Sequence, residues 1–178
     1  WNTTSATDGL HFLEGRVWDT LGSNVSSYRP VNVYVANALP TVSIWSPANG
    51  STVSRTISLM AGYSGTANIT SMQFNLDGKY LGMADMSLTL DWNTTSAADG
   101  AHSLTAVVTD ALGRTSTSTA ISVTVANGLP SVSISSPTNQ STVAGAISVT
   151  AAASGSAAIA SVQFELDGAN LGAADTTS

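Results

Sequence analysis

Four side chains near the start of the chain could form a binding surface: Phe12, Arg16, Trp18 and Tyr34. Even spacings separate Phe12, Arg16 and Trp18, so one extended strand would present them on one face. Tyr34 lies on the predicted neighbouring strand, about 4.8 Å away. Aromatic rings beside Arg16 and Glu14 suit a sugar ring or a protein partner. Alternatively, this face packs on a preceding domain or is an inert surface.

The two histidines of the chain, His11 and His102, occupy equivalent places in a repeated sequence. A histidine can ligate a metal, but neither has a second histidine or a cysteine nearby in the sequence. We therefore expect His102 to be a structural corner residue. Its ring would hydrogen-bond the preceding turn.

Several aspartates lie in or near predicted turns, where their side chains usually accept hydrogen bonds from backbone N–H groups. Calcium would need six or more oxygens at one site. Because no clustered Asp-x-Asp-x-Asp-Gly occurs, we expect no metal and no cofactor. Asp85 and Asp110 are the weak calcium candidates, at a joint between domains. The aspartates in question are Asp77, Asp85, Asp99 and Asp110, repeated as Asp167, Asp175, Asp8 and Asp19.

Residue patterns of enzymes are absent from the sequence. No Gly-x-Ser-x-Gly motif and no glycine-rich phosphate loop occur. Paired carboxylates for glycoside chemistry usually come from a deep cleft, which a small β-sandwich does not offer. The sequence therefore indicates a protein that is not an enzyme.

Short alternating strands must position these residues. Between residues 40 and 126, apolar and polar residues alternate in short runs separated by turn residues, and no helical period appears. Seven such strands predict an all-β, two-layer antiparallel sandwich. We expect them around 42–45, 57–61, 71–76, from 80, 88–92, 102–108 and 121–125. The expected scaffold residues are Asp77 and Gly78 in a hairpin turn, Asp110 and Gly113 in a tight turn, Trp92 and His102.

The chain contains an internal repeat of about 90 residues. The sequence from Trp1 to Ala6 recurs unchanged from Trp92, and the sequence from Leu39 recurs from Leu129. We therefore predict the C-terminal half of one domain in residues 1–37, a complete domain in 38–126 and the N-terminal half of another in 127–178. Residues that recur would build the fold, whereas residues unique to one copy would face a particular partner.

Several motifs stand out in the repeated sequence: Pro40-x-Val42-x-Ile44-x-Ser46-Pro47, Phe74-x-Leu76-Asp77-Gly78, Trp92, and Asp99-Gly100-x-His102 with Asp110-x-x-Gly113. Together they resemble the bacterial immunoglobulin-like (Big) domains. This resemblance implies an immunoglobulin-like sandwich in a tandem array within secreted or surface proteins, often beside glycoside hydrolases or adhesive regions. Met86-Ser87-Leu88 departs from the pattern, where a proline–aromatic pair is expected before the fifth strand.

Composition narrows the possible partners and the location. Five Lys and Arg against eleven Asp and Glu give a net charge of −6, which argues against nucleic acid and anionic membranes. There is no cysteine, so neither a disulfide framework nor a thiolate metal site is possible. No apolar run is long enough to insert into a membrane. We expect a secreted, extracellular or cell-surface bacterial protein.

The leading interpretation is a non-catalytic spacer, stalk or adhesion scaffold whose partners are the neighbouring domains of the same polypeptide. The linkers, residues 36–40 and 126–130, are short, and a proline stiffens each of them. The alternative is a module that binds a polysaccharide or a surface protein through the aromatic face. The half-domains at the two ends are complementary, so two copies of the chain could also pair in trans.

Overall fold

The computed structural model describes residues 1–26 and 29–176. Strands dominate, and two short 3-10 turns, η1 (Thr3–Ser5) and η2 (Thr94–Ser96), occupy equivalent places in the repeat. None of the described residues belongs to a helix long and apolar enough for a membrane span. The chain forms two compact units. Unit 1 holds residues 1–48, 58–90 and 103–121, and unit 2 holds 49–57, 91–102 and 122–178.

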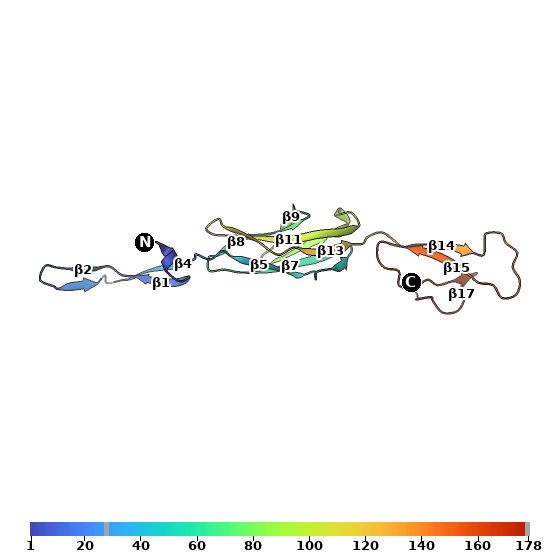
Figure 1. Ribbon diagram of the computed structural model, residues 1–178, viewed down its shortest axis with the longest axis horizontal. Coiled ribbons are helices and arrows are strands. Elements are labelled where there is room, and N and C mark those ends of the chain that lie inside the picture. Colours follow the sequence, from blue (N-terminus) through green and yellow to red (C-terminus); the bar gives the residue numbers. More distant parts are fainter. Residues whose placement is uncertain (27–28, 177–178) are drawn as a thin grey trace. The chain divides into compact units, whose positions relative to one another are not determined.

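Most of unit 1 is a two-layered β-sandwich. One layer contains β5 (Thr41–Ser46) paired antiparallel with β7 (Thr56–Ser64). The other contains β8 (Ile69–Leu76) between β9 (Lys79–Met83) and β11 (Gly100–Asp110), with β12 (Thr115–Thr117) on β11. Figure 1 shows β5 and β7 on one side and β8, β9 and β11 on the other. The sequence alternation places the apolar residues of these strands between the layers.

The core of unit 1 follows that alternation. Every second residue at the end of β11 is fully buried, and the partner strand β8 contributes Phe74 opposite Ala106. Burying one such side chain contributes about 1.5–3 kcal/mol. The most deeply buried apolar side chains of unit 1 are Leu59, Phe74, Leu104, Ala106 and Val108.

The first segment, residues 1–37, belongs to unit 1, and its described residues contain two antiparallel strand pairs. β1 (Gly9–Leu13) pairs with β4 (Val31–Val35), and β2 (Arg16–Trp18) pairs with β3 (Asn24–Ser26). The prediction of one strand carrying Phe12 through Trp18 is therefore wrong, because the strand stops at Leu13 and restarts at Arg16. The equivalent β11 is continuous and has β8 beside it. Glu14 and Gly15 stand at the interruption, where β11 has Thr105 and Ala106, and a glycine weakens the interior of a strand.

Unit 2 contains β6 (Ser51–Val53) paired in parallel with β13 (Ile121–Val125), together with the end of β10 (Thr89–Asn93). Its buried apolar residues include Val53, Trp92, Val123 and Val125. The remaining strands of unit 2 form two short hairpins: β14 (Ser131–Ser136) with β15 (Thr150–Ser154), and β16 (Glu165–Leu166) with β17 (Ala169–Asn170).

The expected all-β immunoglobulin-like sandwich is confirmed, and the strands predicted from alternation are all present. Within unit 1 one sheet has the order β11-β8-β9 and the other contains β7 beside β5, and within unit 2 β6 lies beside β13. Alternation did not reveal β6 and β12, because three-residue strands rich in Ser and Thr carry no apolar period. At the unusual Met86-Ser87-Leu88, Leu88 adopts a φ of 64°, and its carbonyl accepts a hydrogen bond from the Ala61 N–H.

Candidate functional site

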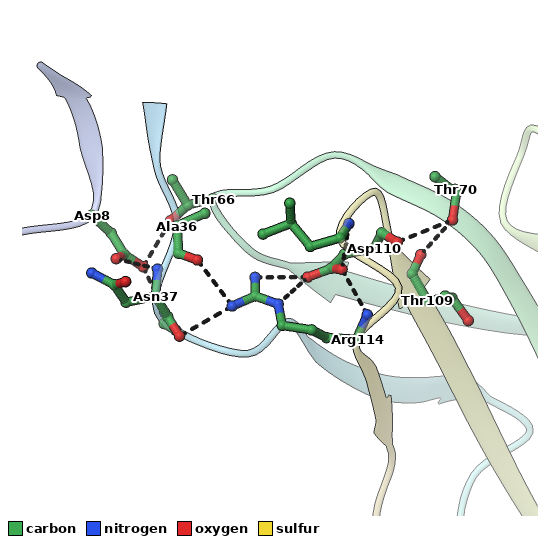
Figure 2. Close-up of polar contacts among 10 residues, drawn as sticks. Asp8, Ala36, Asn37, Thr66, Thr70, Thr109, Asp110 and Arg114 are labelled. Carbon is green, nitrogen blue, oxygen red and sulfur yellow. Dashed lines mark hydrogen bonds and ion pairs between the residues drawn. The ribbon is translucent and has the colours of Figure 1, made fainter. Parts of the chain in front are cut away.

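The linker after the first segment is held by a carboxylate. Asp8 lies just before β1, and its oxygens accept hydrogen bonds from the backbone N–H groups of Asn37, at 2.6 Å, and of Ala38, at 2.9 Å. The Thr66 hydroxyl, on the turn between β7 and β8, reaches the same carboxylate at 3.4 Å. Figure 2 shows Asp8, Asn37 and Thr66 together. Asp8 thereby joins the end of one repeat to the beginning of the next.

Arg114 holds the same linker from the other side. Its Nη1 donates to the carbonyl oxygens of Ala36, at 2.9 Å, and of Asn37, at 3.1 Å. Its Nε and Nη2 lie 2.8 and 2.7 Å from Oδ2 of Asp110. The planar guanidinium therefore binds the Asp110 carboxylate and the two linker carbonyl oxygens at the same time, as Figure 2 shows. A lysine ammonium lacks such a fixed, planar set of donors.

Asp110 orients that arginine. The residue is almost fully buried, and its Oδ1 accepts hydrogen bonds from the N–H groups of Leu112, at 2.9 Å, and Arg114, at 3.0 Å. A turn of the type predicted for Asp110 and Gly113 follows, with Gly113 at a φ of 77°. Asp110 thus stabilises the turn and also orients the Arg114 guanidinium.

The electrostatics of this joint favour charged carboxylates. Hydrogen bonds from the backbone of Asn37 and then Ala38 lower the pKa of Asp8. Burial raises the pKa of Asp110, but the Arg114 side chain and the N–H groups of Arg114 and Leu112 outweigh it, so its pKa is also lowered. Both groups are therefore ionised at neutral pH.

The second linker has the same arrangement. The carboxylate oxygens of Asp99 accept hydrogen bonds from the N–H groups of Asn127 and Gly128, both at 2.8 Å, and these bonds lower the pKa of Asp99. Ser156, the repeat equivalent of Thr66, donates its hydroxyl to the Gly128 carbonyl at 3.0 Å. Both linkers are thus held by an aspartate of the preceding repeat and contacted by a hydroxyl of the following one.

An asparagine in each linker completes the pattern. Oδ1 of Asn37 accepts a hydrogen bond from the Thr3 hydroxyl at 3.1 Å, and Oδ1 of Asn127 accepts one from Thr94 at 3.0 Å. Asn127 also receives the backbone N–H of Arg55 at 2.9 Å. The two linker asparagines therefore form hydrogen bonds with the repeat that precedes each linker.

Sequence reasoning assigned Asp8 and Asp99 only to turns and did not identify Arg114. An aspartate two residues from a turn gives no sign that its partner lies about 29 residues further along the chain. A usable signal existed for Arg114, because its repeat equivalent is Ser23. A charged residue present in one copy only is a candidate for a local contact.

The structure divides the predicted aromatic face into two pairs. Leu10 is opposite Tyr34 and Phe12 is opposite Asn32, so Phe12 and Tyr34 share one face of the β1–β4 hairpin. They are 64% and 75% exposed. Arg16 and Trp18 share a face of the separate β2–β3 hairpin, opposite Ser26 and Asn24, and Trp18 is 61% exposed.

The scaffold residues occupy well-defined places. Nε2 of His102 lies 2.8 Å from the Ala98 carbonyl, and Nε2 of His11 lies 2.7 Å from that of Thr7. Asp77 and Gly78, with φ values of 51° and 76°, form the turn between β8 and β9. The Asp77 carboxylate also accepts the Ser103 N–H at 2.8 Å, and Trp92 is buried in unit 2.

No cluster of three or more His, Cys, Asp or Glu side chains suited to a metal occurs among the described residues. Of the two calcium candidates, Asp110 is paired with Arg114. Oδ1 of Asp85 accepts hydrogen bonds from the N–H groups of Ser87 and Thr89 and from the Thr89 hydroxyl, at 2.9 to 3.0 Å. Both carboxylates therefore stabilise their own turns.

One two-layered sandwich, together with linker contacts that recur in both copies, defines the class of immunoglobulin-like β-sandwich modules in tandem. The profile of the bacterial Ig domain family matches residues 40–106 and 130–178. The chain belongs to this family, as its motifs predict. No protein among the curated sequences matches it.

Two solved structures are similar to parts of the chain. The endo-beta-1,4-mannanase from Thermotoga petrophila aligns with a TM-score of 0.45 and 18% identity, over 51% of this chain and 20% of the mannanase. The fibronectin(III)-like modules of Clostridium thermocellum CbhA align with a TM-score of 0.43 and 24% identity, over 48% of this chain and 94% of the modules. The aligned region is thus about a fifth of the mannanase.

Proposed function

We propose that the chain is a non-catalytic spacer, stalk or adhesion scaffold in a secreted or cell-surface bacterial protein. In this proposal residues 38–126 form a complete domain, residues 1–37 are the C-terminal half of the domain before it, and residues 127–178 are the N-terminal half of the domain after it. Its partners are the neighbouring domains of the polypeptide.

The observation that carries the proposal is the repeated linker contact. Asp8 and Asp99 each bind the two N–H groups of a linker, and Thr66 and Ser156 contact the same regions from the following repeat. A flexible tether needs no such contacts, because Gly- and Ser-rich chains separate domains without them. These contacts are present at both linkers, which favours a function in which the orientation of one module relative to the next is fixed.

Distance measurements between two spin labels test the spacer function. The chain has no cysteine, so Leu21→Cys and Met86→Cys introduce labels at two strongly exposed positions without competing sites. Leu21 lies in the first segment and Met86 lies between β9 and β10. A spacer with a controlled joint gives one narrow distance distribution. A distribution as broad as that of a Gly/Ser-linked control would overturn the proposal.

The exposed pair Phe12 and Tyr34 supports a second candidate, binding of a polysaccharide or a surface protein. Two aromatic side chains on one sheet face present a flat apolar surface to a sugar ring. Retention on immobilised polysaccharides should be lost in the double variant Phe12→Ser, Tyr34→Ser. The matched control is Trp45→Ser, which changes an exposed tryptophan outside this face. Unchanged retention of the double variant would contradict this candidate.

A further inference from the structure

The sandwich of unit 1 contains a hollow of about 410 Å³, where the end of β7, the start of β8 and the turn between β9 and β10 come together. This volume is in the range of small-ligand sites, roughly 300–1,000 Å³. Most of the lining residues are apolar, and one charged residue, an aspartate, is found among the described residues that line it. The lining includes Tyr63, Met72, Met83, Asp85, Met86 and Leu88.

Three of the large side chains in this lining occur in only one copy of the repeat. The following repeat has two alanines and a threonine at the equivalent positions. Methionine side chains adapt readily to the shape of a ligand. Since the residues that build the scaffold recur, these three are candidates for a contact that only this copy makes. They are Tyr63, Met83 and Met86, with the equivalents Ala153, Ala173 and Thr176.

The backbone of Leu88, in the wall of the hollow, has an unusual conformation. Its φ is 64°, a region that bulky residues rarely adopt. The Leu88 N–H donates to the Asp85 carbonyl at 3.0 Å, and the Leu88 carbonyl accepts the Ala61 N–H at 3.3 Å, so the conformation is held from both sides. Such residues cluster at ligand and active sites. The segment that departs from the family pattern therefore contributes Met86 and Leu88 to the hollow.

Asp85 supplies a negative charge with one oxygen available. Its hydrogen bonds from the N–H groups of Ser87 and Thr89 and from the Thr89 hydroxyl all go to Oδ1. Oδ2 accepts no hydrogen bond from any residue that the structure describes. Hydrogen bonds from the backbone and the hydroxyl of Thr89 lower the pKa of Asp85, so the carboxylate is ionised at neutral pH.

We propose that this hollow binds a small organic cation, in which an ammonium group is attached to an aromatic or aliphatic body. The body packs against Met83 and Leu88, the ammonium group pairs with Oδ2 of Asp85, and the Tyr63 ring adds a cation–π contact. An anion would be repelled by Asp85 and by the net charge of −6. The proposal goes beyond the spacer function and does not depend on it, because no linker residue lines the hollow.

NMR spectra of the chain with carbon-13 in its methionine methyl groups test the site directly. Of the four methionines, Met72, Met83 and Met86 line the hollow and Met60 does not. The probe is benzylammonium, and benzyl alcohol is the uncharged control of similar size. Benzylammonium should shift the three lining signals at lower concentrations than benzyl alcohol does, and should leave Met60 unchanged. No shift with benzylammonium, or equal affinity for both molecules, would overturn the proposal.

A variant of Asp85 tests the charge without removing the turn. Asp85→Asn keeps an oxygen that can accept the hydrogen bonds from Ser87 and Thr89. It should weaken benzylammonium binding about two- to fivefold, as loss of an exposed ion pair does, and leave benzyl alcohol binding unchanged. The matched control Asp91→Asn changes an exposed aspartate that does not line the hollow and should bind benzylammonium normally. Equal affinities of Asp85→Asn and the unchanged chain for benzylammonium would overturn the proposal.

A variant of Tyr63 tests the aromatic contact. Tyr63→Ala introduces the residue of the following repeat and should weaken benzylammonium binding more than benzyl alcohol binding, because only the cation is attracted by the ring. An equal loss for both molecules would remove the cation–π contact from the proposal. Linker residues are unchanged in these variants, so the spin-label distances that test the spacer function can fail or succeed independently.

Discussion

The ring of Trp45 occupies the space that a side chain on Gly62 would need. A Cβ placed on Gly62 would lie 1.9 Å from Cζ2 of Trp45, far inside van der Waals contact. The two residues lie on the paired strands β5 and β7. In the following repeat the equivalent residues are Ser135 and Ala152, so the larger residue on one strand accompanies the smaller one on the other.

We therefore predict that Gly62→Ala destabilises the protein by about 1–3 kcal/mol, the usual cost of inserting a methyl group into a packed place. In the Trp45→Ser background the same substitution should cost little, because the ring is gone. Urea unfolding of the two single variants and the double variant measures the coupling. An equal cost in both backgrounds would show that Trp45 does not restrict Gly62.

Arg114 should control the order of the first joint. Arg114→Ser introduces the residue of the equivalent position, Ser23, and removes the hydrogen bonds to the Ala36 and Asn37 carbonyls. We expect a broader distance distribution between labels at Leu21→Cys and Met86→Cys, and a lower Tm because buried Asp110 loses its cation. Arg16→Ser, an exposed arginine on β2, is the control and should change neither. An unchanged distance distribution in Arg114→Ser would show that Arg114 does not order the joint.

The joint should loosen in acid. The pKa of Asp8 is lowered by folding, so its carboxylate contributes fully above the unfolded value of about 3.9. That contribution is lost as the pH falls through the lower folded pKa. The label distances should therefore stay narrow at neutral pH and broaden only once the pH has fallen below that unfolded value. In Asp8→Asn the distribution should be broad at every pH. If the distance distribution of Asp8→Asn stayed narrow at neutral pH, the Asp8 carboxylate would not be holding the linker.

Two phenylalanines should differ sharply in their contribution to stability. Phe74 is fully buried between the layers, so Phe74→Ala should cost about 3–5 kcal/mol. Phe12 is exposed on β1, so Phe12→Ala should change stability by no more than about 0.5 kcal/mol. Urea denaturation followed by tryptophan fluorescence measures both. Similar costs would mean that Phe12 is covered in solution, as a partner on the aromatic face would require.

The local alternation of apolar and polar residues was sufficient to predict most strands, but not the strands that lie beside them. The alternation around Phe74 and Leu104 predicts two strands that bury one face each, and both are present. It does not predict that Phe12 and Trp18 fall on separate strands. The same sequence period forms one continuous strand in β11, which has β8 beside it, and two strands in the first segment. The break falls at Glu14 and Gly15, where β11 has Thr105 and Ala106, so two residues of low strand preference divide the first segment.

The sequence by itself determined the all-β class, the repeat of about 90 residues, the turns at Asp77-Gly78 and Asp110, and the family. These features depend on residue type and on periods of a few residues, which are local. Only the tertiary structure decided that Asp8 and Asp99 hold linkers and that Arg114 connects Asp110 to the Ala36 and Asn37 carbonyls. Hydrogen bonds between residues 28 to 78 positions apart exist only after strand pairing has brought them together, and no local pattern encodes that pairing.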